Sequence, residues 1–363
     1  MNTNSYFTIE LLAAGNVWIS LPNTDGTEVT TTFYYWVDSV PNANRDNYDG
    51  TINTTGNVVY VYKNGSYNLP VGTVVRFYRA ETTRLANASD SGWYHRIGSG
   101  VNIKVSGNLA SLIGFSETIP TYCFRYLFYS SNIVDASELE LPWTTLSQWC
   151  FGRMFMNCTK LTEPPYLPAT TLDNSCYRLM FRNCTSLKIL ARMDCKNLVF
   201  ASHYAMYQLC TALEKVTIPL FDTYANQALA FMFNGCSGLK ELTVECPEVL
   251  STEHMFYCLA GSCMNLERFT CLAKSSTANC TQNWLGNDAS YAAEHVTFIK
   301  HPDATFWPTD STSGIPSGWT VKNMNPQVQS IDFNDTTGVY VKGNQKIVKI
   351  YGQNNTVLWE ENT

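Results

Sequence analysis

The chain has 363 residues, of which 45% are hydrophobic and 15% charged, and its formal net charge at pH 7 is −6. This length allows two or three domains with a sizeable core, and such a weakly charged composition is typical of extracellular or virion β-rich proteins. The acidic balance without a long basic run argues against a nucleic-acid partner. No apolar run approaches the ~18 residues that a membrane span needs, so we expect no membrane insertion.

The N-terminal segment MNTNSYFTIELLAAGNVWISL alternates apolar and polar residues and lacks the apolar block of a signal peptide. Phe7, Ile9 and Leu11 fall on one face, which predicts a strand. We therefore expect a protein that does not leave the cell by the usual secretion route. The alternative is a chain whose export signal has been removed.

Residues 1–104 are predicted to form an all-β sandwich. Alternating segments predict strands at 6–12, 16–21, 28–37 and 101–105. The segment VVYVYKNGSYNLPVGTVVRFYR at 58–79 predicts a hairpin around Asn64-Gly65. The aromatic residues here suggest either a core or sugar-stacking platforms, and we favour the core. They are Trp18, Tyr34, Tyr35, Trp36, Trp93 and Tyr94.

One phrase recurs between residues 105 and 322. FRNCTSLK at 181–188 is preceded by FMNCTKLT from Phe155 and followed by FNGCSGLK from Phe233. The leading aromatic residue repeats at intervals of 27, 26, 26, 26 and 23 residues, in the series Phe128, Phe155, Phe181, Tyr207, Phe233 and Phe256. A leucine-type position repeats at 27, 26, 26, 26 and 27 residues, in the series Val134, Leu161, Leu187, Leu213, Leu239 and Leu266. A period in the twenties is the range of leucine-rich repeats, which predicts a solenoid of roughly six or seven coils.

Each repeat unit is predicted to hold a short helix, a turn and a short strand. In CYRLMFRNC, Cys176, Met180 and Cys184 stand at i, i+4 and i+8, which is an apolar helical stripe. Leu187 then leads the strand. The segment 101–114 is expected to form the first strand and turn of the solenoid and to close its open end. The predicted fold class is therefore α+β.

Most of the thirteen cysteines are predicted to be buried thiols. Most of them share repeat positions, namely Cys158, Cys184, Cys210, Cys236 and Cys263, with Cys123, Cys150 and Cys176 upstream. A position that stacks on its own copies has to be small and apolar, which suits free cysteine. The rival hypothesis, a zinc site, lacks a Cys-x-x-Cys pair anywhere in the chain. We predict no metal and no other cofactor.

Residues 326–363 are predicted to form a small β tail module. Three alternating apolar pairs mark strands separated by the turns KGNQ and GQNN, namely Val339 with Val341, Val348 with Ile350, and Val357 with Trp359. Fewer than ~40 residues rarely fold alone. We expect this module to dock on the solenoid or on another subunit.

The repeat resembles a known family. MFRNCTSL at 180–187, with LPATTL at 167–172, looks like the BspA-type leucine-rich repeat, and NCTQNWLGNDAS at 279–290 and FWPTDSTSGIPSGWTV at 306–321 resemble the segment that closes such arrays. The family includes surface adhesins of gut Bacteroidales and proteins encoded by their phages. The resemblance covers about 105–321 and implies a binding scaffold. Later coils depart from the pattern, because Leu209 and Gly235 replace the asparagine and the LPATTL link is lost.

The sequence contains no recognisable catalytic motif. There is no Gly-x-Ser-x-Gly, no P-loop and no His-Glu-x-x-His, and the five histidines are scattered. We expect His203 and His254, inside repeat units, to be solvent-facing or satisfied. Glu138 and Glu140 in SELEL could share one strand face as a carboxylate pair, but solvated side chains are the interpretation we favour. We therefore predict a protein that is not an enzyme.

The candidate binding residues follow the leucine-type positions, where a strand shows side chains on the open face of the solenoid. They are Glu163, Lys188, Glu214, Lys215, Lys240, Glu241, Glu267 and Arg268, with Tyr166 as an aromatic neighbour. Opposite charges fall on successive coils. We favour inter-coil ion pairs, each of which adds little stability. The alternative is a polar recognition strip.

These features and the resemblance predict a phage virion structural protein, as a fibre, tail or capsid-decorating component. It would attach to other virion proteins at one end and display the solenoid to a host surface protein or glycan. Fibre proteins often assemble as homo-oligomers, which this chain could do as well. The first alternative is a secreted adhesin of the bacterial cell surface. The second is a carbohydrate-binding accessory module.

Overall fold

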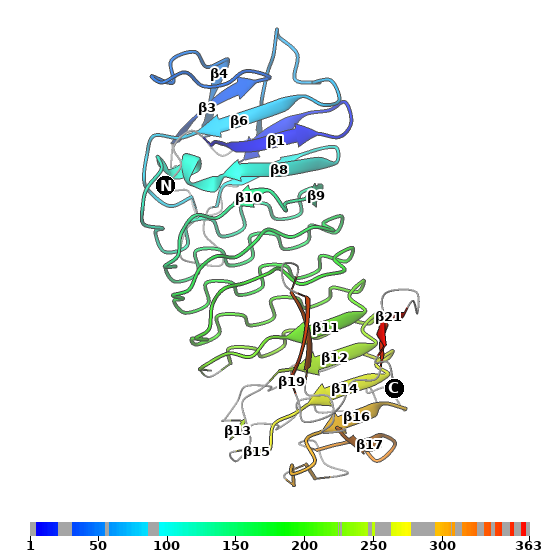
Figure 1. The fold of residues 1–363 in the computed structure, drawn as a ribbon. Coiled ribbons are helices and arrows are strands. Elements are labelled where there is room, and N and C mark those ends of the chain that lie inside the picture. The colour runs from blue at the N-terminus through cyan, green and yellow to red at the C-terminus, as the bar shows by residue number, and fades with distance from the viewer. Residues whose placement is uncertain are drawn as a thin grey trace.

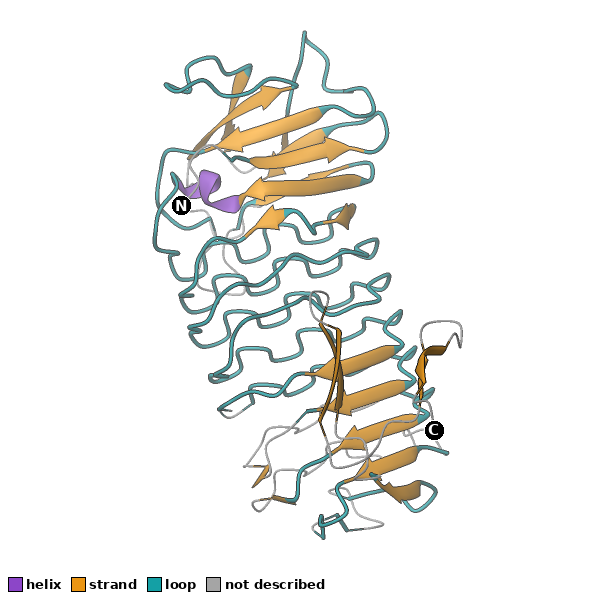
Figure 2. Cartoon of the chain, in the orientation of Figure 1, coloured by secondary structure: helices purple, strands orange, loops and turns teal. Residues whose placement is uncertain are grey.

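The computed structural model is an elongated stack of β-structure, with the N-terminal sheet at one end and the last strands of the solenoid at the other (Figure 1). It describes residues 5–20, 31–54, 58–85, 94–223, 225, 227–245, 249–250, 263–276, 295–305, 307–308, 314–324, 330–334, 338–342, 349–351 and 357–360. Strands, turns and loops make up nearly all of this part (Figure 2). Its one helix is the 3-10 helix η1 (Leu109–Ile113), and none of its helices could cross a membrane.

Two sheets form the N-terminal part of the chain. The larger has the strand order β10-β8-β1-β6-β3-β4, with β9 also paired to β8, and the smaller has the order β5-β2-β7. The strands are β1 (Phe7–Leu11), β2 (Val17–Ser20), β3 (Thr31–Val37), β4 (Gly50–Thr54), β5 (Val58–Tyr60), β6 (Val74–Tyr78), β7 (Arg96–Ser99), β8 (Ile103–Asn108), β9 (Ile133–Asp135) and β10 (Leu139–Glu140). The strands predicted at 6–12, 16–21, 28–37 and 101–105 are confirmed as β1, β2, β3 and β8, although residues 21 and 28–30 lie outside the described residues. Strands β4 and β7 were not predicted.

Strand β8 joins the larger sheet to the solenoid. One edge pairs antiparallel with β1, where Val105 lies opposite Ile9, and the other edge pairs parallel with β9 and β10. The sheet therefore continues across residue 104, and a separate sandwich over residues 1–104 is not supported. The expected closure of the solenoid by 101–114 is confirmed, and the rings of Phe7 and Phe128, 5.6 Å apart, carry the core across this junction.

The hairpin predicted at 58–79 is wrong, although its turn is present. Asn64 and Gly65 have φ angles of 52° and 79°, and Lys63 and Ser66 exchange both backbone hydrogen bonds, which is a tight two-residue turn. The flanking strands then separate, because β5 pairs with β2 while β6 pairs with β1 and β3. Leu69 pairs instead with Gly15, so the turn closes a short loop between two sheets.

The solenoid has about seven turns, and its repeat period is confirmed. Backbone bridges join residues one period apart, such as Thr145 with Thr171 and Asn197 with Thr223. The leucine-type residues form a fully buried column at Leu161, Leu187, Leu213 and Leu239. A single coil cannot shield its own leucine-type residue from water, so the column is buried only because neighbouring coils stack on one another.

The segment predicted as a helix is a series of tight turns. The Tyr177 N–H donates to the Ser202 carbonyl of the next coil at 3.0 Å, whereas the Met180 N–H donates to the Tyr177 carbonyl, three residues back, at 3.1 Å. An α-helix would direct every N–H to the carbonyl four residues back. Every fourth residue is left-handed, with φ of 59° at Leu179 and 61° at Asn183.

A four-residue turn period explains the failed helix prediction. Cys176, Met180 and Cys184 are all buried, as the apolar stripe predicted, but spacing of i, i+4 and i+8 fits a repeating turn as well as a helix. The α+β class is therefore not supported, and the described chain is nearly all β. We call these stretches the turn segments: 121–130, 148–157, 174–183, 200–209 and 227–235.

Stacked aromatic rings and thiols fill the core beneath the turn segments. The leading aromatic residues stack from coil to coil with ring centroids 5.1, 5.5, 5.4 and 6.0 Å apart, in the order Phe128, Phe155, Phe181, Tyr207 and Phe233. A cysteine thiol in the following coil donates to the backbone carbonyl of each, at 3.0, 3.2, 3.1, 3.2 and 3.5 Å from Cys158, Cys184, Cys210, Cys236 and Cys263. The cysteine position therefore combines a small apolar group with a weak donor.

The ten described cysteines are free and buried, which confirms the prediction for them. Burial raises the pKa of Cys158 and of Cys210 to about 12, because a thiolate is poorly solvated in the core. Cys246, Cys258 and Cys280 lie outside the described residues, as do Trp93, His254, Phe256 and the segment NCTQNWLGNDAS.

Later coils carry regular parallel strands on one side. They are β11 (Lys215–Ile218), β12 (Glu241–Val244), β14 (Arg268–Cys271), β16 (Thr297–Lys300) and β17 (Thr320–Asn323), and β13 (Val249–Leu250) pairs with β15 (Ser275–Ser276). The core ends where Trp307 and Trp319 lie 4.8 and 6.4 Å from the Phe298 ring.

The tail strands pair antiparallel as β18 (Ser330–Asn334) with β19 (Gly338–Lys342) and β20 (Lys349–Tyr351) with β21 (Val357–Glu360). Three of these four strands were predicted and β18 was not.

Candidate binding surfaces

The predicted charged strip lies on the parallel strands, where neighbouring coils align its residues. The register places Lys215, Glu241 and Arg268 side by side on β11, β12 and β14. Lys215 Nζ lies 3.1 Å and Arg268 Nη1 lies 3.8 Å from the Glu241 carboxylate, and Lys240 Nζ lies 3.0 Å from Glu214 Oε2. The inter-coil ion pairs that we favoured are thus present, and because they are largely exposed each contributes little stability.

The other predicted strip residues have different surroundings. Glu267 is exposed beside Arg268, and its backbone N–H donates to the Lys240 carbonyl at 2.8 Å. Glu163 and Lys188 are exposed on earlier coils. The Tyr166 hydroxyl donates to Asp194, and the Arg192 guanidinium carbon lies 4.8 Å from the centre of the Tyr166 ring.

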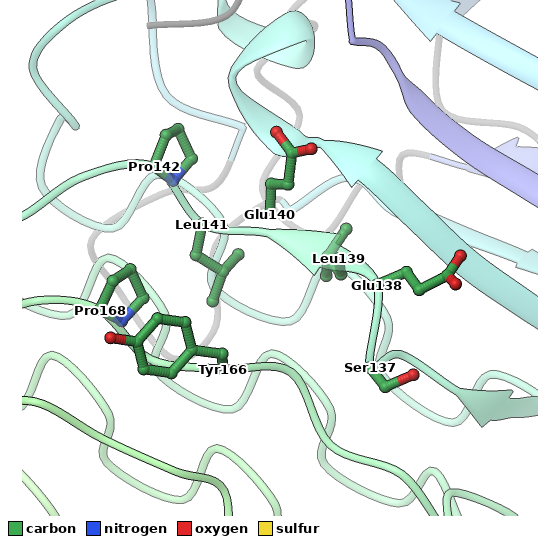
Figure 3. Close-up of a pocket in the computed structure, with 8 residues that line it drawn as sticks. All are labelled: Ser137, Glu138, Leu139, Glu140, Leu141, Pro142, Tyr166 and Pro168. Carbon is green, nitrogen blue, oxygen red and sulfur yellow. The ribbon is translucent and has the colours of Figure 1, made fainter. Parts of the chain in front are cut away.

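A shallow hollow of about 370 Å³ lies beside Tyr166. Ser137, Glu138, Leu139, Glu140, Leu141, Pro142, Tyr166 and Pro168 line it. In Figure 3, the Glu138 and Glu140 carboxylates extend in different directions, and neither points at Tyr166. The two carboxylates do not face a common point, as an acid–base pair across a glycosidic bond would.

Arginine and aromatic side chains alternate on the turn segments, a feature that our sequence analysis missed. The Arg125 guanidinium carbon lies 5.0 Å from the centre of the Tyr126 ring and 4.9 Å from that of Trp149. Arg178 lies 5.4 Å from Trp149 and 3.9 Å from Tyr204. These distances are typical of cation–π contacts.

Further contacts extend this array along the turn segments and to Tyr94 in the N-terminal part. Arg153 lies 5.2 Å from the Tyr126 ring and donates to its hydroxyl, and the Tyr122 and Trp149 rings are nearly parallel at 6.3 Å. Tyr94 stacks on Tyr126 at 4.5 Å. We call Tyr122, Arg125, Tyr126, Trp149, Arg153, Arg178 and Tyr204 the arginine–aromatic band.

The turn segments carry charge of one sign only. Their charged residues are Arg125, Arg153, Arg178 and Arg182, and none of the 30 aspartates and glutamates of the chain falls in them. Arg125 is buried and its pKa is lowered to about 10, mainly by burial, so it remains charged at neutral pH. Aligning the turn segments by their repeat would have exposed this segregation in the sequence.

The buried histidines are part of the core. A second ladder of stacked rings runs through Phe124, Phe151 and Tyr177. His203 takes the next place in it, 5.4 Å from the Tyr177 ring, and its Nδ1 lies 3.0 Å from the Ser202 hydroxyl. His95 Nδ1 lies 3.0 Å from the Leu85 carbonyl oxygen. Burial lowers the pKa of His95 to about 4 and that of His203 to about 3, so both are neutral near pH 7. His203 therefore has a hydrogen-bond partner inside the core, which confirms one of the two alternatives that we gave for it, while exposure to solvent is excluded.

The aromatic residues considered as sugar platforms in the N-terminal part lie in two environments. Trp36 and Tyr35 are buried in the core. Tyr34 is half-buried and packs edge-on against Tyr48, 5.0 Å away, and Trp18 lies under the Arg96 guanidinium at 5.5 Å. Across the described ranges, no three histidine, cysteine or acidic side chains come together as they would around a metal ion.

No family model matches the chain, and comparisons with the curated proteins and with the solved structures gave no significant match.

Proposed function

We propose that this chain is a non-enzymatic structural protein of a phage virion, a fibre, tail or capsid-decorating component, whose BspA-type leucine-rich repeats display a surface for binding a host protein or glycan. The observation that carries the proposal is the long solenoid with its ordered outer arrays. Repeat solenoids serve as extended binding surfaces, and the phrases MFRNCTSL and LPATTL resemble repeats of adhesins and phage proteins of gut Bacteroidales.

The burial of the thiols and imidazoles supports a non-enzymatic role. Catalysis needs nucleophiles and bases with accessible, tuned pKa values. Here burial raises the pKa of Cys158 and of Cys210 to about 12. The buried rings of His95 and His203 hydrogen-bond within the core. These groups stabilise the solenoid interior instead of facing a substrate.

The ends of the solenoid suggest how the chain is held. Strand β8 pairs with both the larger N-terminal sheet and the first coil. Attachment at the N-terminal end would therefore also fix the orientation of the coils. Attachment to other virion proteins, or to further copies of this chain, through one terminal β module would leave the turn segments and the strand face free for a host partner.

Mass spectrometry of density-purified phage particles tests the proposal. We expect peptides of this chain in intact particles at a constant ratio to the major capsid protein, and their depletion from washed bacterial envelopes. Peptides confined to the envelope of uninfected cells would overturn the proposal in favour of a secreted adhesin.

A further inference from the structure

We propose that the arginine–aromatic band is a binding site for an acidic, uronic-acid-containing polysaccharide. This inference rests on the proposed function, because it names the ligand class that the displayed solenoid would bind. The band is distinct from the charged strip of β11, β12 and β14, whose lysines and arginine already have glutamate partners.

The sign of the charge selects an anionic partner. The chain carries a net charge of −6, yet the turn segments hold four arginines and no carboxylate. An approaching polyanion is therefore repelled by the molecule as a whole and attracted by this face, which fixes where it binds. Guanidinium groups bind carboxylates through paired hydrogen bonds, and Arg153 and Arg178 are half-exposed and accessible to such a ligand.

The rings favour a sugar polymer over other anions. Tyr122, Tyr126, Trp149 and Tyr204 are all half-exposed, and aromatic faces carry the negative side of the ring quadrupole, which attracts the polarised C–H groups of a pyranose. A guanidinium stacked on a ring is held in one orientation, so little side-chain entropy is lost when a carboxylate binds it.

The spacing suits a repeating ligand. Neighbouring turn segments exchange backbone hydrogen bonds, so coils recur at about the 4.8 Å spacing of paired strands. Arg153 and Arg178, the two partly exposed arginines of the band, belong to neighbouring coils, so they lie about 5 Å apart along the stack. A linear polymer with closely and regularly placed carboxylates can offer one carboxylate to each of these two arginines.

The members of the band have different roles. Arg125 is buried between Tyr126 and Trp149, so it is a positioning residue that orders the rings. Arg153 and Arg178 are the ligand-contacting cations.

Isothermal titration of the full chain with a polygalacturonate oligosaccharide tests the proposal, with two matched probes. The methyl-esterified oligosaccharide keeps the sugar rings without the charge, and poly-L-glutamate keeps the charge without the rings. We expect binding to polygalacturonate, at least about tenfold weaker binding to poly-L-glutamate, and none to the ester at the same concentration. Equal binding of the ester or of poly-L-glutamate, or no binding of polygalacturonate, would overturn the proposal.

Charge-removing variants locate the site. We expect Arg153→Gln and Arg178→Gln each to weaken binding about tenfold, and the double variant about a hundredfold, as loss of charge-assisted hydrogen bonds implies. Lys215→Gln with Lys240→Gln removes the same charge from the strand face and should change binding less than twofold. The opposite ranking would refute the assignment.

Circular dichroism verifies that each variant is folded, and Arg153→Lys with Arg178→Lys gives a milder second test, in which loss of the planar fork alone weakens binding. Detection of the chain in particles without polygalacturonate binding would refute this inference and leave the virion proposal standing.

Discussion

Replacing the buried His203 with phenylalanine should remove one proton from the pH dependence of stability. Burial holds the pKa of His203 at about 3, whereas an unfolded histidine titrates near 6.5. Above pH 6.5 neither state binds the proton. Between about 6.5 and about 3 only the unfolded chain binds it, so the free energy of unfolding falls as the pH falls, and below about 3 the loss stops.

The size of the effect follows from the two pKa values. One pKa unit corresponds to about 1.36 kcal/mol, so His203 lowers the stability of the wild type by about 2 kcal/mol between pH 7.5 and pH 5.0. Phenylalanine has no such proton and fits the ladder position, which lies 5.4 Å from the Tyr177 ring and 6.1 Å from the Phe221 ring. The stability of His203→Phe relative to the wild type should rise by about 2 kcal/mol over this range.

Urea unfolding followed by tryptophan fluorescence at pH 7.5 and pH 5.0 measures this difference. Leu209→Asn is the control, because it alters no titrating group, and it should change stability equally at both pH values. Comparing differences cancels every other titrating group, including His95. A stability difference between His203→Phe and wild type that is the same at both pH values would refute the burial argument.

Three further predictions concern the coil interior. Tyr207→Phe should destabilise the protein by about 1–3 kcal/mol in thermal unfolding, although four other described coils hold phenylalanine there, because the Ala191 N–H donates to the Tyr207 hydroxyl at 3.0 Å and would lose its buried acceptor; an unchanged Tm would contradict this. Leu209→Asn should stabilise by about 1 kcal/mol, because Leu209 has φ of 64° and asparagine tolerates the left-handed region; a lower Tm would count against the turn conformation. The ten described thiols should resist iodoacetamide at pH 8 in the folded protein and react in guanidinium, because burial keeps them protonated and inaccessible. Peptide-resolved mass spectrometry measures the labelling of each cysteine, and rapid labelling of the native protein would show that the core is not closed.

The periodic features of the fold were predictable from the sequence because each depends on a position contacting its own copies. The interval of the leucine-type residues, the burial of the repeated cysteines and the ion pairs between Lys215, Glu241 and Arg268 all follow from stacking. Stacking was visible without knowledge of the local backbone, since identical spacing is enough to bring copies together.

The backbone within each coil was not predictable from apolar spacing alone. Buried residues at i, i+4 and i+8 satisfy both a helix and a four-residue turn repeat. The discriminating signal was the last residue of the turn segment, which is Asn157, Asn183 and Gly235 in three coils, with φ of 64°, 61° and 75°. Asparagine and glycine mark left-handed backbone, and their recurrence argued for turns.

The arginine–aromatic band was missed for a different reason. Its members lie in different registers of the repeat, so no single motif contains them. They come together only because the turn segments stack, as when Arg178 reaches Trp149 in the previous coil and Tyr204 in the next. The strand strip, by contrast, repeats in one register and was found for that reason.

Gold labelling of intact phage particles most directly tests the claim that the solenoid is displayed on a virion. Fab fragments raised against the folded chain would be applied to purified particles and examined by electron microscopy. The account predicts gold at a fixed position on the outside of most particles, abolished by competition with the free protein. Unlabelled particles beside a labelled bacterial envelope would contradict it.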